Sequence, residues 1–251
     1  MALTPPIFGV LGLLVGSFLN VMIARLPADE SLVRPRSHCP HCGHGIRFYD
    51  NVPVLSWLLL RGRCRDCRES ISARYPLVEA LTGALCALAV VAKGGDEDAL
   101  LAVAFVLVLV PVAFIDLDHR IIPNRILLPG AVAAVVILAV TDPERLPEHL
   151  IAGGAAGLFF LLAALAYPSG MGMGDVKLAA VMGLYLGSSV VPALLVALLA
   201  GSLVGVTIIA RDGVAAGRKT AVPFGPFLAL GALVGLFWGP LIVAWYGDAF
   251  L

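Results

Sequence analysis

Residues 178–210 read LAAVMGLYLGSSVVPALLVALLAGSLVGVTIIA and contain no Asp, Glu, Lys or Arg. One α-helix of this length would measure about 50 Å, because each residue adds about 1.5 Å. The hydrocarbon core of a bilayer is only about 30 Å thick. The segment 187–192 (Gly-Ser-Ser-Val-Val-Pro) lies inside the run and is rich in residues that interrupt helices. The run therefore predicts two membrane-spanning helices, at 175–187 and 190–210.

Charge-free runs recur along the whole chain. The sequence is 60% hydrophobic and 14% charged, whereas soluble domains are about 25% charged. Such a chain has too little polar surface to cover a water-soluble globule. We therefore predict an all-α polytopic membrane protein with about eight transmembrane helices. The other six spans are expected at 6–25, 75–92, 99–116, 126–141, 150–167 and 223–246.

The basic residues predict the orientation of these spans. The first Lys or Arg is Arg25, so positive charge follows the first apolar stretch, as in a retained anchor rather than a cleaved signal peptide. Eight of the 17 Lys and Arg residues lie from Arg34 to Arg74, which predicts a cytoplasmic segment. The loops 118–125 and 211–219 are also basic and expected in the cytoplasm, with both termini outside. On short loops between spans these charges do not predict a nucleic-acid partner.

Two cysteine pairs lie in the polar segment after the first span. They are Cys39-Pro-His-Cys42 and Cys64-Arg-Asp-Cys67, with 21 residues between them. Four thiolates at this spacing are typical of a tetrahedral Zn²⁺ site. A small segment without a large apolar core needs such a metal to hold one conformation. The segment 27–74 is therefore predicted to be a cytoplasmic zinc-binding module whose ligands are Cys39, Cys42, Cys64 and Cys67.

Other interpretations of the cysteines remain. Disulfides are one, although the reducing cytoplasm disfavours them. A dithiol redox site is another, but one pair would suffice for it. Three histidines flank the first pair, and one of them could replace a thiolate as ligand: His38, His41 and His44.

Three carboxylates lie at predicted ends of spans. Asp116 follows the charge-free run 99–115, Asp118 comes two residues later, and Asp175 ends the segment Gly170-Met-Gly-Met-Gly-Asp. In the predicted topology Asp116 closes a helix that reaches the cytoplasmic face and Asp175 begins one that leaves it. We therefore expect the two carboxylates at the same depth. Ionisable residues within a membrane are costly and usually functional.

Two neighbouring carboxylates can hydrolyse a peptide bond. One acts as general base on a water molecule while the other acts as general acid, and like charges so close do not ionise together. Asp116 and Asp175 are therefore the predicted catalytic pair. For Asp175 the alternative is a helix N-cap. For Asp116 or Asp118 it is an interfacial charge paired with a basic neighbour, His119 or Arg120.

The chain resembles the bacterial prepilin peptidases, also called type IV leader peptidases, over nearly its full length. Gly-x-Gly-Asp alone is a weak signal, but six blocks in this order are specific to that family. The blocks are Gly16-Ser-Phe-Leu-Asn-Val21, the two cysteine pairs, Arg74-Tyr-Pro-Leu-Val-Glu79, Asp116-Leu-Asp-His-Arg-Ile-Ile-Pro123, Gly172-Met-Gly-Asp-Val-Lys-Leu178 and Pro223-Phe-Gly-Pro226.

This resemblance implies a function. Members of the family remove the basic leader from type IV prepilins and from pilin-like subunits of type II secretion, at the cytoplasmic face of the inner membrane. The catalytic pair of the family falls on Asp116, rather than Asp118, and on Asp175. Many members also N-methylate the new terminus with S-adenosylmethionine, an activity that accompanies the cysteine module. No Gly-rich nucleotide fingerprint for that donor is visible in the sequence.

Several further residues are candidates for substrate binding. Gly172 and Gly174 allow close backbone approach and leave room for an extended substrate. Lys177 could act on the aspartate pair or bind a substrate carboxylate, with an interfacial, snorkelling lysine as the alternative. Glu79 could contact substrate or methyl donor, with an interfacial carboxylate as the alternative. Asn20, inside the first span, is expected to hydrogen-bond another helix.

The expected organisation is a first span at 1–26, the zinc module at 27–74 and a membrane peptidase domain at 75–251. Two other functions compete with this one. An ion transporter would use the same aspartates as a relay, but no inverted repeat is visible. A non-enzymatic assembly factor would use the zinc module as a docking surface. Presenilin-like peptidases share Gly-x-Gly-Asp but lack the zinc module. The oligomeric state is not predicted.

Overall fold

The computed structural model describes residues 4–95, 98–167, 170–213 and 222–250. Within these ranges it is helical, without a named strand. Seven segments are long and apolar enough to cross a membrane, and Met173–Arg211 counts as one of them. The predicted all-α membrane fold is confirmed. The long helices are α1 (Pro5–Arg25), α3 (Arg74–Ala92), α4 (Asp98–His119), α5 (Asn124–Thr141), α6 (Leu146–Ala166), α7 (Met173–Leu186), α8 (Val190–Asp212) and α10 (Gly225–Phe250).

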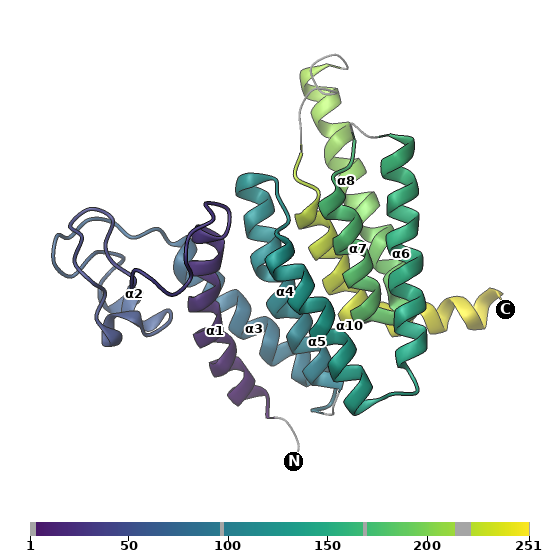
Figure 1. Cartoon of the computed structure of the whole chain (residues 1–251), viewed down its shortest axis with the longest axis horizontal. Coiled ribbons are helices and arrows are strands. Elements are labelled where there is room, and N and C mark those ends of the chain that lie inside the picture. The colour runs from purple at the N-terminus through teal and green to yellow at the C-terminus, as the bar shows by residue number, and fades with distance from the viewer. Residues whose placement is uncertain (1–3, 96–97, 168–169, 214–221, 251) are drawn as a thin grey trace. The chain divides into compact units, whose positions relative to one another are not determined.

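The chain forms two units, Met1–Pro111 and Val112–Leu251. In the first unit α1 packs along α3 (Figure 1). Glycines permit this close approach, as is usual between membrane helices. A Cβ atom on Gly12 or Gly16 would lie 2.9 Å from a backbone Cα atom of α3. Asn20, one turn beyond Gly16, donates from Nδ2 to the carbonyl of Tyr75 on α3 at 3.0 Å, which confirms the expected helix-to-helix hydrogen bond.

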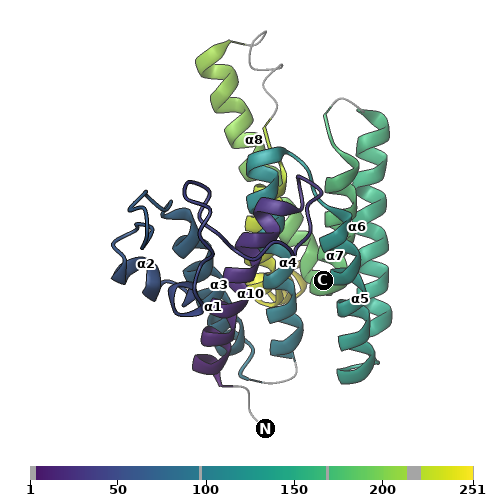
Figure 2. The same cartoon turned by 60° about the vertical axis from the view of Figure 1, so that its left-hand side comes forward.

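The polar segment between α1 and α3 contains little regular structure. It has a 3₁₀ turn η1 (Phe48–Asn51), a short helix α2 (Leu55–Leu59) and isolated β-bridges around the cysteines. Its one tryptophan, Trp57, is half-buried and donates from Nε1 to the carbonyl of Ile71 at 3.0 Å. This segment lies beside α1 in both views (Figures 1 and 2).

In the second unit the helix is interrupted where the sequence predicts it. α7 ends at Leu186, the 3₁₀ turn η2 (Gly187–Ser189) follows, and α8 begins at Val190. Gly187 has φ +55°, a conformation that glycine adopts without strain. Figure 1 shows α7 and α8 as separate rods that meet at this turn. Of the expected basic loop 211–219, residues 214–219 lie outside the described part of the chain.

The helix α7 is held on two sides. Figure 2 shows α5, α6 and α7 running side by side. α6 approaches α7 so closely that a Cβ on Gly183 would lie 2.5 Å from the carbonyl oxygen of Ala152. On the other side Tyr185 donates its hydroxyl to the carbonyl of Gly130 on α5 at 2.7 Å. These contacts fix the axis of the helix whose first turn carries Asp175.

Candidate active site and metal centre

Asp116 lies in the last turns of α4 and is 5% exposed. Its Oδ2 accepts a hydrogen bond from the backbone N–H of Gly225, the first residue of α10, at 2.8 Å. A buried carboxylate is costly unless it is hydrogen-bonded. The contact with Gly225 therefore fixes the side chain of Asp116 in one orientation.

Asp175 lies in the first turn of α7 and is half-buried. Its Oδ2 accepts the backbone N–H of Gly172, the residue before the helix, at 3.1 Å. This is a capping contact, since an acidic side chain in the first turn satisfies a free backbone donor. Asp175 is the third residue of the helix and not the N-cap, so the N-cap alternative is only partly realised.

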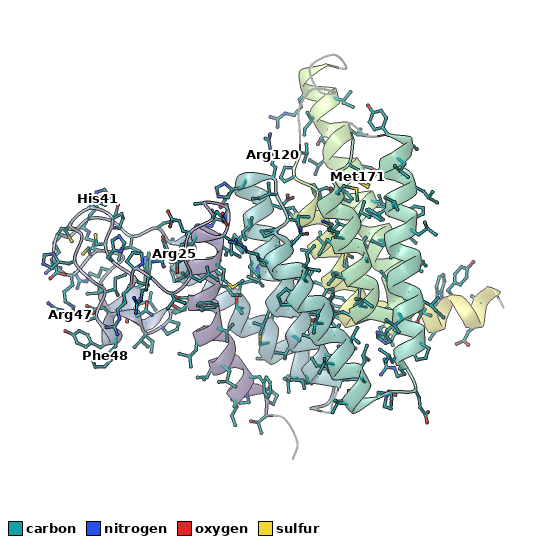
Figure 3. The ribbon with its side chains drawn as sticks, in the orientation of Figure 1. Arg25, His41, Arg47, Phe48, Arg120 and Met171 are labelled. Atoms are coloured by element: carbon teal, nitrogen blue, oxygen red, sulfur yellow. The ribbon has the colours of Figure 1, made fainter. Side chains whose placement is uncertain are left out.

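The segments that carry the two carboxylates pack together, because a Cβ on Gly174 would lie 3.0 Å from the Cβ of Ile122, in the loop after α4. Figure 3 shows Arg120 and Met171, neighbours of the two aspartates in the chain, at the same end of the second unit. The structure thus brings the predicted pair together from α4 and α7.

Asp118 differs from Asp116 in its environment. Asp118 is exposed, whereas Asp116 is buried and receives the N–H of Gly225. Asp118 also engages in a contact of its own and is not a free charge. The geometry therefore favours Asp116 as the partner of Asp175.

Gly225 is a site residue that sequence reasoning missed. Its neighbour Phe224 packs against Phe160 of α6 and Phe227 of α10, with ring centroids 6.3 and 6.2 Å apart. These aromatic contacts hold the turn that directs the N–H of Gly225 toward Asp116. The available signal was the segment Phe224-Gly-Pro-Phe227, for which the sequence suggests a wall of the substrate groove or a helix-entry turn but not a backbone N–H directed at Asp116.

The other candidate binding residues have different partners. Lys177 donates from Nζ to Oδ1 of Asn124, the first residue of α5, at 3.0 Å. Glu79 lies in the first unit, is 8% exposed and accepts the backbone N–H of Val54 through Oε2 at 2.8 Å. Glu79 therefore contacts the polar segment between α1 and α3. Lys177 lies one helical turn after Gly174 in α7.

Four cysteines form a cluster that can hold a metal ion. The sulfur atoms of Cys39, Cys42, Cys64 and Cys67 all lie within 4.8 Å of one another, and none is in a disulfide. The Cys39 and Cys67 sulfurs are 3.8 Å apart. A tetrahedral Zn²⁺ with Zn–S bonds of about 2.3 Å requires sulfurs about 3.8 Å apart. The donor set and its spacing therefore fit a four-coordinate thiolate site.

The two cysteine pairs adopt the same local fold. The N–H of Cys39 donates to the carbonyl of His44, and the N–H of Cys64 donates to that of Glu69, at 2.9 and 2.8 Å. The fourth residue after the first cysteine of each pair is in the left-handed region, Gly43 at φ +70° and Arg68 at φ +62°. The backbone N–H groups of Cys42 and His41 lower the pKa of Cys39 to about 6, which favours its thiolate. Desolvation and the neighbouring thiols raise the pKa of Cys42 and of Cys67.

Comparisons with known proteins place the chain among membrane peptidases. A model of the bacterial peptidase A24 N-terminal domain matches residues 10–93, and a model of the type IV leader peptidase family matches residues 101–210. A protein of Aeromonas hydrophila named prepilin leader peptidase/N-methyltransferase is 37% identical, over 95% of this chain and 92% of that protein. One of the same name from Burkholderia pseudomallei (strain 1026b) is 39% identical, over 92% and 84%.

A third relative, from Myxococcus xanthus (strain DK1622), carries the same name and is 42% identical over 83% of this chain. The match covers 64% of that relative's own length. No solved structure matches the chain.

Proposed function

Because the chain belongs to the type IV leader peptidase family, we propose that it removes the basic leader from type IV prepilins or from pilin-like subunits of type II secretion. The reaction takes place at the cytoplasmic face of the inner membrane. The observation that carries this proposal is the pair of carboxylates from α4 and α7, one fixed by Gly225 and the other by Gly172. The names of the relatives support the same activity.

In the proposed mechanism both aspartates hold the attacking water. Their Oδ2 atoms are engaged with backbone N–H groups, so their Oδ1 atoms face the water. One carboxylate takes a proton from the water as its oxygen attacks the scissile carbonyl carbon. The other, which starts protonated, gives its proton to the carbonyl oxygen. The first carboxylate then passes the proton that it took from the water to the leaving amine, while the second takes a proton back from the hydroxyl group as the C=O bond re-forms. The C–N bond breaks, and the leader leaves with a new carboxyl end.

The glycines before Asp175 are proposed to receive the extended substrate. Gly172 is exposed, so a substrate strand can approach its backbone. Gly174 has a packing role as well, because its missing Cβ makes room for Ile122. Lys177, held by Asn124, is proposed to bind a substrate carboxylate beside the pair.

The four-cysteine cluster is proposed to bind structural Zn²⁺ through Cys39, Cys42, Cys64 and Cys67. Without a metal the module has only a small apolar core to maintain its fold, since Trp57 is half-buried and the apolar side chains of Phe48 and Leu59 are 87% and 83% exposed. The relatives' names further support a second activity, N-methylation of the cleaved substrate, for which S-adenosylmethionine supplies the methyl group. We propose the substrate and the lipid bilayer as the partners of this chain.

A cleavage assay with matched variants tests the peptidase assignment. Asp116→Asn and Asp175→Asn each remove one member of the pair, while the exposed Asp118→Asn is the control. We expect each of the first two to lower the cleavage rate of a pilin precursor by at least about 10²-fold, the contribution of one general acid or base. Asp118→Asn should cleave at the wild-type rate, and membrane levels of all three should match the wild type.

Full cleavage by Asp116→Asn or Asp175→Asn would contradict the assignment. The competing functions would then be tested directly. Proton flux in liposomes that depends on these aspartates would favour a transporter. Pilus or secretion assembly that survives the loss of either aspartate would favour a scaffold.

A further inference from the structure

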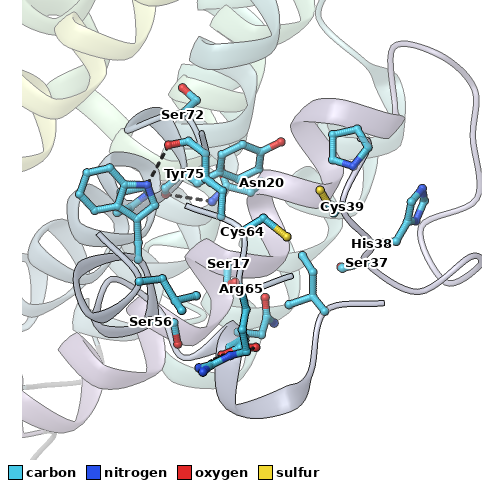
Figure 4. A pocket seen from close by; sticks show the side chains of 18 of the residues that line it. Ser17, Asn20, Ser37, His38, Cys39, Ser56, Cys64, Arg65, Ser72 and Tyr75 are labelled. Atoms are coloured by element: carbon cyan, nitrogen blue, oxygen red, sulfur yellow. Dashed lines mark hydrogen bonds and ion pairs between the residues drawn. The ribbon is translucent and has the colours of Figure 1, made fainter. Parts of the chain in front are cut away.

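The first unit contains a cavity of about 340 Å³ between the polar module and the helices α1 and α3. Figure 4 shows it from close by, with Asn20 and Tyr75 on the helix side and Cys39 on the module side. Its volume is within the range of pockets that bind small molecules. Neither Asp116 nor Asp175 lines it, since both belong to the second unit.

Glu79, a residue of α3, lines this cavity, and its side chain is buried, with 8% of the residue exposed. Its Oε2 accepts the N–H of Val54 at 2.8 Å. Val54 has φ +62° and ψ −51°, and the N–H of Leu55 donates to the carbonyl of Pro53 at 2.6 Å. This is the strained form of γ-turn, which is rare and worse for a β-branched residue. Strain of this kind persists where surrounding structure imposes it, often at functional sites.

A structural role alone does not explain a carboxylate at this position. An uncharged amide would accept the same hydrogen bond from Val54, whereas an ionisable group in a membrane helix is costly. The second oxygen, Oε1, is the part of the side chain that chemistry in the cavity can use. A proton acceptor is the function that a carboxylate has and an amide lacks.

We propose that this cavity is the site of methyl transfer, and that Glu79 accepts the proton that the α-amino group of the cleaved substrate must lose. The proposal rests on the N-methyltransferase activity proposed above. It adds the place of that activity in the fold and a catalytic residue for it.

The walls of the cavity fit the methyl donor chemically. The aromatic side chains of Trp57 and Tyr75 line it and offer flat surfaces to an adenine ring. The ring of Trp57 is oriented by its hydrogen bond to the carbonyl of Ile71.

Four carboxylates line the cavity. Asp50 is paired with Arg65, whose Nε lies 2.9 Å from Oδ2, Asp66 is paired with Arg47 at 3.7 Å, and Glu69 accepts the backbone N–H of Ser70. Glu79 is the one of the four that is buried and belongs to a long apolar helix.

The reaction balances with one proton acceptor. The new α-amino group is an ammonium ion, and its nitrogen has no lone pair until a proton leaves. Glu79 takes that proton. The nitrogen then forms a bond to the methyl carbon while the carbon–sulfur bond breaks, and the electron pair of that bond stays on sulfur, which becomes neutral. The product is a methylated ammonium, and the proton on Glu79 passes to solvent.

Glu79→Gln is the decisive variant, because glutamine still accepts the Val54 N–H but cannot take up a proton. The full-length protein would be purified with its metal and given a prepilin and tritiated S-adenosylmethionine. We expect kcat for methylation to fall by about 10²-fold or more, a far larger change than in prepilin cleavage or in the Kd of S-adenosylhomocysteine, which calorimetry measures in parallel. Glu79→Asp should recover part of the methylation rate. Glu30→Gln, an exposed carboxylate before the module, is the matched control.

Methylation by Glu79→Gln at the wild-type rate would overturn the catalytic role and leave Glu79 as a structural acceptor. Loss of S-adenosylhomocysteine binding in this variant would also overturn it, since the role proposed is in chemistry and not in binding. The location is tested by ultraviolet crosslinking of labelled S-adenosylmethionine. Label on Trp57 or Tyr75 is expected, and label confined to residues 112–251 would refute the location.

The two proposals fail in different ways. A wild-type protein that cleaves prepilin but neither methylates it nor binds S-adenosylhomocysteine overturns only this inference. A wild-type protein that does not cleave prepilin overturns the proposed peptidase function.

Discussion

The buried Asp116 takes its orientation from a backbone group 109 residues away in the chain, the N–H of Gly225. Gly225 has to be a glycine because a Cβ there would lie 2.8 Å from Oδ2 of Asp116 and 3.0 Å from its Cβ. Asp116 is held inside α4 and has little room to move away. One methyl group at position 225 would therefore displace the carboxylate.

Gly225→Ala is expected to reduce prepilin cleavage by about 10²-fold, the cost of a displacement of roughly 1 Å at a catalytic group. The effect should appear in kcat rather than in the membrane level of the protein. Gly205→Ala is the matched control, because a Cβ on Gly205 meets no atom within 4 Å. Equal cleavage by the two alanine variants would show that the Gly225 contact does not position Asp116.

Single residues differ in how far the sequence predicts them. Asp116 and Asp175 stand out in the sequence as candidates because a charge at the end of an apolar run is unusual. Gly225 and Val54 do not, because each acts through a backbone N–H, which carries no residue-specific signal. The partner of Lys177 was also beyond the sequence, since Asn124 is 53 positions away and reaches it only in the folded chain.

Among the helices, the pair α6 and α7 decides where Asp175 lies. A Cβ on Gly183 would approach the carbonyl oxygen of Ala152 to 2.5 Å. Backbone atoms cannot give way as a flexible side chain does, so any larger residue must separate the helices. Because Asp175 is in the first turn of α7, this separation would carry it away from Asp116.

Gly183→Ala is therefore expected to lower both the thermal stability in detergent and the cleavage rate. The loss of stability should be about 1–3 kcal/mol, as for other overpacked cores. Gly154→Ala on α6 serves as the control, because a Cβ on Gly154 meets nothing within 4 Å. A Gly183→Ala protein with the unfolding temperature and cleavage of the wild type would refute this account of the packing.

The two turns that carry the cysteine pairs have the same backbone conformation, so opposite substitutions can be compared in the two. Gly43 and Arg68 occupy the same left-handed position in the two turns, where a side chain costs about 1–2 kcal/mol. We expect Gly43→Ala to weaken metal binding about tenfold and Arg68→Gly to strengthen it. Competition with a chelator, followed by metal analysis of the purified protein, measures both. The same change in affinity for both variants would contradict the expectation.

The sequence predicts whole helices better than it predicts the module. The spans expected at 6–25 and 75–92 correspond to Pro5–Arg25 and Arg74–Ala92, because apolar length and flanking charge determine membrane helices. Between them, the γ-turn at Val54 and the cavity depend on contacts between the module and α3. Such contacts leave no periodic pattern in the sequence, so only the cysteine spacing was predicted there.

At the scale of the whole molecule, the two proposed activities, prepilin cleavage and methylation, are assigned to different units of the chain. The first unit carries the metal centre and the cavity, and the second carries the aspartate pair. We therefore expect removal of the metal by a chelator to abolish methylation, whereas it should change prepilin cleavage much less. Parallel assays on chelated and metal-restored protein in the same membranes test this. Equal loss of both activities would show that the metal centre supports the peptidase as well.

The shortness of α7 has a consequence for the lipid that surrounds it. α6 and α7 are level at one end, where the N–H of Ser188 donates to Glu148 at 3.0 Å, but they have 21 and 14 residues. Farther along, a Cβ on Gly157 would lie 3.0 Å from the Cβ of Ala180. Gly157 is nine residues from the end of α6 and Ala180 is seven from the start of α7, so at about 1.5 Å per residue α7 stops about 3 Å short of that end of α6. Asp175 is two residues inside α7, about 6 Å from the level of the end of α6, and we expect it to lie below the membrane surface.

Hydrophobic mismatch should then control the enzyme. Short acyl chains bring the headgroup region closer to the level of Asp175, and long chains move it farther away. Prepilin cleavage in vesicles of graded acyl-chain length is expected to be fastest in thin bilayers and to fall as they thicken, with equal incorporation of protein. A rate independent of chain length would mean that the thickness of the bilayer does not limit access of water to Asp175. On this account, the cleavage rate would report the thickness of the membrane in which the peptidase works.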